Sequence, residues 1–205
     1  MIDLEAVRRA PVAHAPFDYF TATGVLSADA LAGINKDFPD LPGPGVYPLK
    51  DIHYGQAFED LIGDIKSSDF EDLIGEKIGV DLSDKPLMIT VRGFCQRKDG
   101  RIHTDSKDKV VTCLLYLNEP WAQSGGRLRL LRGPDDMEDV IAEVPPDGGT
   151  LVVFKRSDNS WHGHHPFEGQ RRYVMFNWVA SEALKTKNIV RHSISAKFKR
   201  LNPFR

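Results

Sequence analysis

The feature that most constrains the fold is a change of hydrophobic period at Pro86. Before it, apolar residues recur at the spacing of amphipathic helices, in the stripes Phe58, Leu61, Ile62, Ile65 and Phe70, Leu73, Ile74, Ile78. After it come short β-branched and apolar segments with turn residues between them, at 86–96, 109–118, 125–132, 148–155 and 171–180. Short strands separated by turns favour an antiparallel sandwich or barrel.

The chain of 205 residues is long enough for one domain with a real core. We expect a single domain with three parts: a helical N-terminal support (1–84), a β core (85–180) and a C-terminal helix or tail (181–205). Within the first part, Ser27 is a good N-cap for a helix over 28–38. The predicted fold class is mostly β with flanking α.

Composition places the chain among ordinary globular proteins, with 41% hydrophobic and 27% charged residues. No apolar run approaches the ~20 residues of a membrane helix, so we expect no membrane partner. The N-terminal segment lacks the basic start and apolar middle of a signal peptide, which predicts a cytoplasmic location. Cys95 and Cys113 lie in apolar, strand-like contexts and are expected to be reduced packing residues.

Charge is unevenly distributed along the chain. Residues 1–84 carry 6 Lys and Arg against 16 Asp and Glu, whereas residues 85–205 carry 21 against 13. The basic second part suits an anionic substrate or cosubstrate. No basic patch interleaved with aromatic residues is visible outside the C-terminal tail, so a nucleic-acid partner is not expected.

The segment "RIHTDSK" holds the first candidate metal ligands. His103 and Asp105 are separated by one residue, and in an extended chain such residues point to the same face. A His-x-Asp pair plus a distant histidine forms the 2-His-1-carboxylate triad, which holds Fe(II) on one face and leaves the other open. His-x-Asp alone is a weak signal, but this pair directly precedes a long core strand.

Three histidines compete for the third position: His162, His164 and His165. His162 and His164 share a face if the chain is extended, whereas His165 points the other way. His165 is therefore expected at the surface, and alternation alone leaves His162 and His164 both open.

Two arginines follow the histidines. On the strand 171–180, Arg172 shares a face with Val174, Phe176 and Trp178, and this face is the more apolar one. We therefore expect Arg172 to face inward, where a lone guanidinium needs an anionic partner such as a carboxylate. Arg171 lies on the opposite face, and the alternative is that Arg171 and Arg172 are both rim residues.

Taken together, these motifs resemble the 2-oxoglutarate/Fe(II)-dependent dioxygenases, and among them the prolyl 4-hydroxylase-like group. The likeness is greatest to the HIF prolyl hydroxylases and their bacterial relatives. The matching segments run in family order over about 99–178: "DGRIHTD", "VTCLLYLNEPW", "GGRLRLL", "LVVFKRSDNSWHGHHP" and "RRYVMFNW". The resemblance implies a double-stranded β-helix, or jelly-roll, with N-terminal helices packed on it.

The resemblance also implies roles for single residues. His103, Asp105 and His162 match the iron ligands, because the family's distal histidine follows an "SD" loop and precedes a proline by four positions, as His162 precedes Pro166. Arg172 matches the arginine that anchors 2-oxoglutarate.

Two further residues match the pocket that holds 2-oxoglutarate. Tyr116 matches a tyrosine that helps to bind the far carboxylate, and Leu128 matches an apolar residue that lines the pocket. One departure is that several relatives carry a tyrosine about ten residues before the first iron histidine, where this chain has Arg92, Gly93 and Phe94. The departure bears on a prolyl-peptide substrate more than on the iron chemistry.

The implied reaction hydroxylates a substrate C–H bond while 2-oxoglutarate and O₂ are converted to succinate and CO₂, with Fe(II) as cofactor and ascorbate as reductant. The primary substrate is either a protein side chain, with proline as the first candidate, or a small or sugar-type metabolite. A different class is a non-catalytic metal-binding jelly-roll that acts as a sensor.

Overall fold

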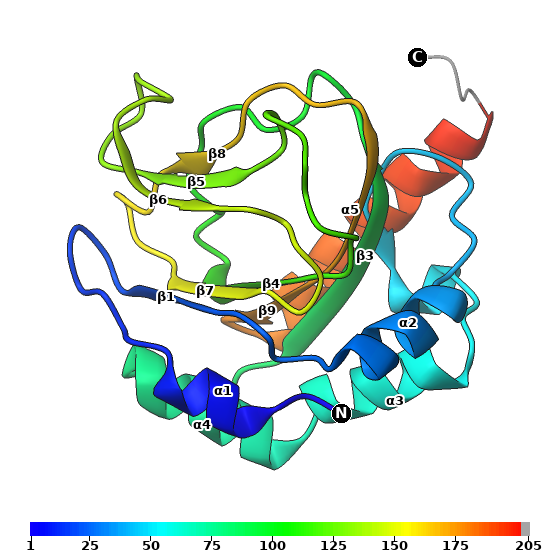
Figure 1. Cartoon of the computed structure of the whole chain (residues 1–205), viewed down its shortest axis with the longest axis horizontal. Helices are drawn as coiled ribbons and strands as arrows, with labels where there is room; N and C mark the ends of the chain where they lie inside the picture. The colour runs from blue at the N-terminus through cyan, green and yellow to red at the C-terminus, as the bar shows by residue number, and fades with distance from the viewer. Residues whose placement is uncertain (202–205) are drawn as a thin grey trace.

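The larger of two antiparallel sheets lies, in Figure 1, between the helices drawn below it and the smaller sheet above it. The computed structural model describes residues 1–201, with side chains up to Ile194. The strand order of this major sheet is β1–β7–β4–β9–β3–β2. Its strands are β1 (Tyr19–Ala22), β2 (Tyr47–Pro48), β3 (Leu87–Cys95), β4 (Lys109–Tyr116), β7 (Leu151–Lys155) and β9 (Gly169–Val179).

The minor sheet lies above the major sheet in Figure 1 and has the order β6–β5–β8. Its strands are β5 (Leu128–Leu131), β6 (Val140–Val144) and β8 (His162–Gly163). The two sheets enclose an interior between them, and this arrangement confirms the predicted jelly-roll with flanking helices.

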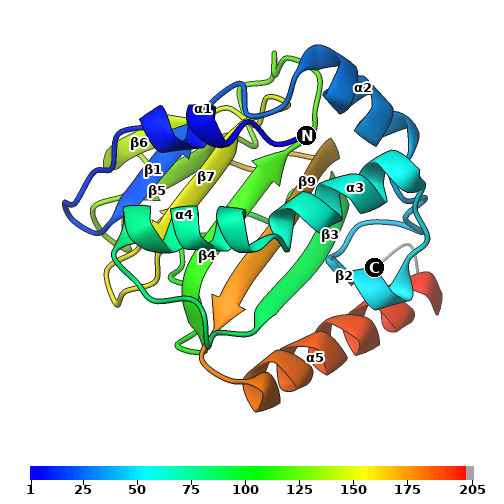
Figure 2. The same ribbon diagram turned by 90° about the horizontal axis from the view of Figure 1, so that it is seen from below.

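Helices cover the other face of the major sheet, as Figure 2 shows from below. They are α1 (Leu4–Arg9), α2 (Ala28–Lys36), α3 (Gln56–Ile65) and α4 (Ser68–Ile78), with a short 3-10 helix at Leu49–Asp51. The side chains of Ser27 and Ser67 accept hydrogen bonds from backbone N–H groups in the first turns of α2 and α4, which explains where these helices begin. Helix α5 (Glu182–Leu201) lies beside β2 and β3.

Both faces of the major sheet are therefore buried, and alternation along each strand divides its residues between two cores. On β9, Val174, Phe176 and Trp178 pack against the helices. Tyr173 on the same strand packs between the two sheets, with Leu128 from β5. This division decides which side chains can reach the interior of the jelly-roll.

The expected elements are present, with shorter bounds in most cases. The helical first part also contributes two strands, since β1 pairs with β7 and β2 pairs with β3. Five elements were not expected: α1, β2, the 3-10 helix at Leu49–Asp51, β6 and β8. Within the described residues no helix combines the length and apolarity that a membrane span requires.

Candidate functional site

His103, in the connection between β3 and β4, pairs with His162 of β8 in the minor sheet. His103 and His162 form an isolated antiparallel bridge, in which each backbone N–H donates to the other residue's carbonyl oxygen, at 3.0 and 2.9 Å. This pairing brings the two imidazole rings to 4.3 Å between centroids. Asp105 lies beside them, and the candidate ligand atoms of the three residues all fall within 4.8 Å of one another.

Hydrogen bonds fix how the two rings are presented. Nδ1 of His103 lies 2.8 Å from the carbonyl oxygen of Arg101, and Nδ1 of His162 lies 2.9 Å from that of Ser160. Because a carbonyl only accepts, Nδ1 carries a proton in both rings, and Nε2 is the nitrogen that each ring can offer to a metal. Burial lowers the pKa of His162 to about 4, so its ring is neutral near pH 7. Both rings are thus presented as metal ligands commonly are.

The carboxylate of Asp105 is held from two sides. Thr112 Oγ1 donates to Oδ2 at 2.6 Å, and Lys109 Nζ donates to Oδ1 at 2.8 Å. Burial alone would raise the pKa of Asp105, but the charges of Lys109 and His162 and these hydrogen bonds hold it below its usual range. Asn177 Nδ2 donates to Thr112 Oγ1 at 2.9 Å, which leaves the Thr112 hydroxyl proton for Asp105.

Two imidazoles and one ionised carboxylate make up this cluster. That donor set is the one found in non-haem Fe(II) oxygenases, and it leaves open coordination positions. The residues present therefore fit Fe(II).

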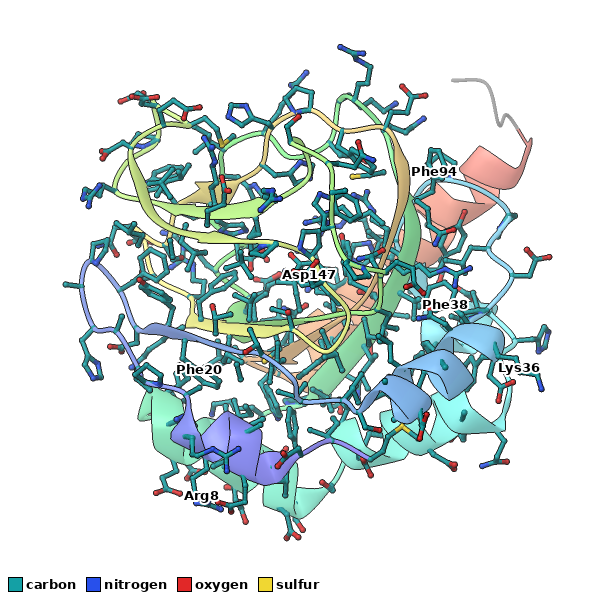
Figure 3. All side chains as sticks on the ribbon, in the orientation of Figure 1. Arg8, Phe20, Lys36, Phe38, Phe94 and Asp147 are labelled. Atoms are coloured by element: carbon teal, nitrogen blue, oxygen red, sulfur yellow. The ribbon has the colours of Figure 1, made fainter. Side chains whose placement is uncertain are left out.

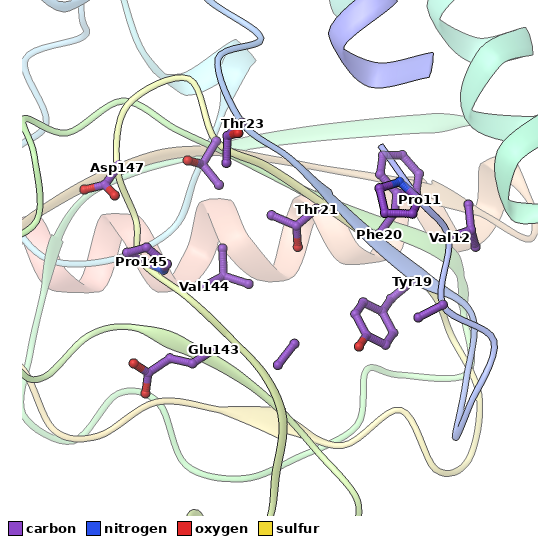
Figure 4. Close-up of a pocket in the computed structure, with 13 residues that line it drawn as sticks. Pro11, Val12, Tyr19, Phe20, Thr21, Thr23, Glu143, Val144, Pro145 and Asp147 are labelled. Carbon is purple, nitrogen blue, oxygen red and sulfur yellow. The ribbon is translucent and has the colours of Figure 1, made fainter. Parts of the chain in front are cut away.

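The cluster opens into a cavity of about 220 Å³ between the sheets. Its apolar walls are Leu114, Leu128 and Met175, and its polar walls include Arg171 and Tyr173. A larger hollow of about 490 Å³ lies between β1 and the segment after β6, as Figure 4 shows, and it shares no residue with the triad. The small cavity, rather than the large hollow, therefore adjoins the candidate chemistry.

Arg171 supplies the positive charge of this cavity. Its side chain is only 2% exposed, donates from Nε to the carbonyl oxygen of Gly126 at 2.8 Å, and donates from a terminal nitrogen to Tyr116 Oη at 3.1 Å. The guanidinium also lies 5.2 Å from the ring centroids of both Tyr116 and Tyr173. Among the described residues it forms no ion pair with a carboxylate, so the cavity holds a buried cation that lacks an anion.

The expectation that Arg172 faces this cavity is wrong. Its guanidinium lies on the helical side of the sheet, where it donates to Asn35 Oδ1 at 3.0 Å and stacks 4.6 Å from the Phe38 ring centroid. The alternation itself is correct, since Val174, Phe176 and Trp178 share the face of Arg172. That apolar face packs on the helices, and the more polar face of Arg171 lines the cavity.

The other two predicted pocket residues lie at the wall of this cavity or directly behind it. Leu128 lines the cavity, and Tyr116 is fully buried behind Arg171. His164 also lines the cavity, and its Nε2 lies 3.8 Å from Cys95 Sγ. His165 points away, as alternation predicts, and its Nε2 lies 2.7 Å from Glu138 Oε1.

Sequence reasoning missed several side chains that line or support the site. Arg171 and Tyr173 lie two positions apart on β9 and therefore share a face. The sequence would have predicted both residues if the cavity-lining face of β9 had been known. Lys109 and Thr112 follow Asp105 by four and seven positions, and no local pattern signals their contacts with it. Arg92 lines the cavity at the place where relatives were expected to carry a tyrosine, and it forms an ion pair with Asp99 at 3.2 Å.

Comparison with known proteins finds one matching family model and several solved structures of similar fold. Residues 93–180 match the model of the 2OG-Fe(II) oxygenase superfamily. No curated protein matches the chain.

Among solved structures, a prolyl-4-hydroxylase from Pseudomonas putida is 21% identical, with a TM-score of 0.54, 78% of this chain covered and 85% of that one. A viral collagen prolyl hydroxylase from Paramecium bursaria Chlorella virus-1 is 13% identical, with a TM-score of 0.51 and 80% and 96% covered. HygX from Streptomyces hygroscopicus, solved with nickel and 2-oxoglutarate, is 13% identical, with a TM-score of 0.52 and 80% and 83% covered. At these identities the likeness is one of fold.

Proposed function

We propose that this chain is a 2-oxoglutarate-dependent dioxygenase of the 2OG-Fe(II) oxygenase superfamily, in which His103, Asp105 and His162 hold Fe(II) and Arg171 anchors 2-oxoglutarate. The observation that carries this assignment is the meeting, in one cavity, of a two-histidine, one-carboxylate cluster with a buried arginine that lacks an anion.

The reaction converts substrate C–H, 2-oxoglutarate and O₂ into substrate C–OH, succinate and CO₂. When bound, Fe(II) supplies the redox chemistry that couples the loss of CO₂ from 2-oxoglutarate to hydroxylation of the substrate. The residues of the chain bind, orient and shield the reactants.

Arg171 and Tyr116 provide the donors for the far carboxylate of 2-oxoglutarate. A guanidinium offers a planar fork that matches a carboxylate, and the charge-assisted hydrogen bonds are strong in a cavity that excludes water. The hydrogen bonds from Arg171 to Gly126 and Tyr116 hold the guanidinium in place before the anion arrives. Leu114, Leu128 and Met175 keep water from the reacting groups.

For the primary substrate we propose a polypeptide side chain, with proline as the first candidate. The solved structures of similar fold include proteins described as prolyl 4-hydroxylases. Arg92 gives the cavity wall a charge at the position where the family resemblance predicts a tyrosine, so the sequence around the target residue is expected to differ.

The test measures succinate formed from 2-oxoglutarate by protein supplied with Fe(II), ascorbate and O₂, without a primary substrate. We expect slow uncoupled turnover that Asp105→Ala abolishes. Metal binding without any succinate, alone or with candidate peptides and metabolites, would instead indicate a sensor. Succinate formation stimulated by a small metabolite and by no peptide would refute the polypeptide assignment.

A further inference from the structure

The helical side of the major sheet carries a groove next to the active-site cavity. The groove has a volume of about 590 Å³ and lies between the loop that follows α2 and the ends of β3 and β9. Its walls include Phe38, Leu41, Phe94 and Arg172. Figure 3 shows Lys36, Phe38 and Phe94 on the same side of the molecule, around α2 and β3.

Arg172 is one of the cations that line this groove. It stacks on Phe38 and donates to Asn35 Oδ1, and among the described residues it forms no ion pair with a carboxylate. Burial lowers its pKa, and no neighbouring acid raises it. Its backbone is held on both sides by Asn118, whose Oδ1 accepts from Arg172 N at 2.6 Å and whose Nδ2 donates to Arg172 O at 3.1 Å. The guanidinium is thus fixed, partly desolvated and without a counter-charge.

The charges and the apolar surface of the groove define its ligand. Lys36 adds a second cation, and Asp40 is the one acid among the lining residues. Phe94 is 38% exposed, so its ring offers apolar surface to a ligand in the groove. A ligand with negative charges next to apolar side chains complements this surface.

Two chain segments separate the groove from the active-site cavity. On β3, Arg92 lines the cavity whereas Gly93 and Phe94 line the groove, and a register shift against β9 lies at this point. In the loop before β2, Val46 lines the cavity and Pro44 lines the groove. The groove and the cavity therefore share their walls.

We propose that this groove binds an acidic stretch of the polypeptide substrate, in which an Asp or Glu carboxylate meets Arg172 while an apolar side chain packs on Phe38 and Phe94. The proposal rests on the proposed function, because a neighbouring residue of the same polypeptide enters the cavity. An extended chain advances about 3.3 Å per residue, so a few residues suffice to pass from the groove over the shared wall.

The test uses two immobilised pools of short peptides. In one pool alternate positions are Asp or Glu and the rest are random apolar residues; in the twin pool the charged positions are Lys or Arg. Binding of the full chain, without metal or 2-oxoglutarate, is measured by biolayer interferometry. We expect binding to the acidic pool only, weakened about tenfold or more by Arg172→Glu and largely retained in Arg172→Lys.

A matched control is Arg132→Glu, which reverses an exposed arginine that directly follows β5 and pairs with Asp139. Equal binding to both pools, no binding to the acidic pool, or an equal loss in Arg132→Glu would overturn the proposal. A dimer in sedimentation velocity that Arg172→Glu dissociates would also overturn it, since a second copy would then fill the groove. Succinate formation tests the proposed function separately: peptide binding can fail while uncoupled turnover persists, and the reverse.

Discussion

Arg171 and Arg172 are consecutive residues of β9, yet their guanidinium groups lie on opposite faces of the major sheet. Arg171 donates to Tyr116 Oη between the two sheets, and Arg172 donates to Asn35 Oδ1 on the helical side. Arg171 therefore lines the active-site cavity, and Arg172 lines the groove on the helical side. This separation allows the role of each arginine to be tested against the other.

Replacing Arg171 by Ala is expected to weaken 2-oxoglutarate binding by ~30-fold or more. Truncating one partner of a buried, hydrogen-bonded charge pair costs about 2 kcal/mol or more, and each 1.4 kcal/mol is about tenfold. Calorimetric titration of the Mn(II)-loaded protein with 2-oxoglutarate measures the effect. Arg172→Ala is the matched neighbour, and an equal loss of affinity in both variants would refute the assignment to Arg171.

The distal metal ligand can be assigned by comparing His162 with His164. His162→Ala removes a ring whose Nε2 is free to bind the metal, whereas Nε2 of His164 faces Cys95 Sγ. We expect His162→Ala to lower Mn(II) affinity more than about 100-fold, a larger effect than the 10–100-fold typical of residues that only support ligands. If His164→Ala abolishes Mn(II) binding and His162→Ala does not, the ligand assignment is wrong.

Thr112 is expected to act on the metal through Asp105. Thr112→Val removes the donor to Asp105 Oδ2 and the acceptor for Asn177 Nδ2, so we expect Mn(II) affinity to fall about 10–100-fold. The control is Thr90→Val, a buried threonine on β3 that donates to the carbonyl oxygen of Met175. Should Thr90→Val lower Mn(II) affinity as much, the effect would be one of packing rather than of Asp105 orientation.

Trp178 links β9 to the helical layer without contacting the cavity. Its ring is fully buried, and Nε1 donates to Glu71 Oε2 at 2.8 Å. Trp178→Phe is expected to lower the free energy of unfolding by about 2 kcal/mol, the range for a hydrogen bond to a charged group. Urea denaturation measures this change, and Glu71→Gln, which keeps an acceptor oxygen, should cost less. A drop in Mn(II) affinity in Trp178→Phe would show that the helical layer also shapes the metal site.

The sequence predicted the core strands and the long helices because their signals are local. β4 and β7 are continuous runs of apolar and β-branched residues, α3 and α4 have clear apolar stripes, and Ser67 caps α4. β6 and β8 lack such signals. β6 is a half-exposed edge strand, and β8 has only two residues, which exist as a strand because they pair with β5.

The site residues also divide into those with a local sequence signal and those without one. The spacing of His103 and Asp105 is local, and the structure brings both beside His162. The choice between Arg171 and Arg172 is not local, because both faces of β9 are buried and alternation does not say which core is the cavity. The helices take the most apolar face of β9, so the cavity is left with the polar one. A jelly-roll strand covered by helices should therefore be expected to send its more polar buried face toward the active site.

The assignment of the metal ligands and of the 2-oxoglutarate anchor is tested most directly by a crystal structure of the protein with Mn(II) and 2-oxoglutarate, with the metal located by anomalous scattering. We expect one metal peak bonded to His103, Asp105 and His162, and we expect the far carboxylate of 2-oxoglutarate to bind Arg171 and Tyr116. A metal bound elsewhere, or a carboxylate held by Arg172, would contradict this assignment.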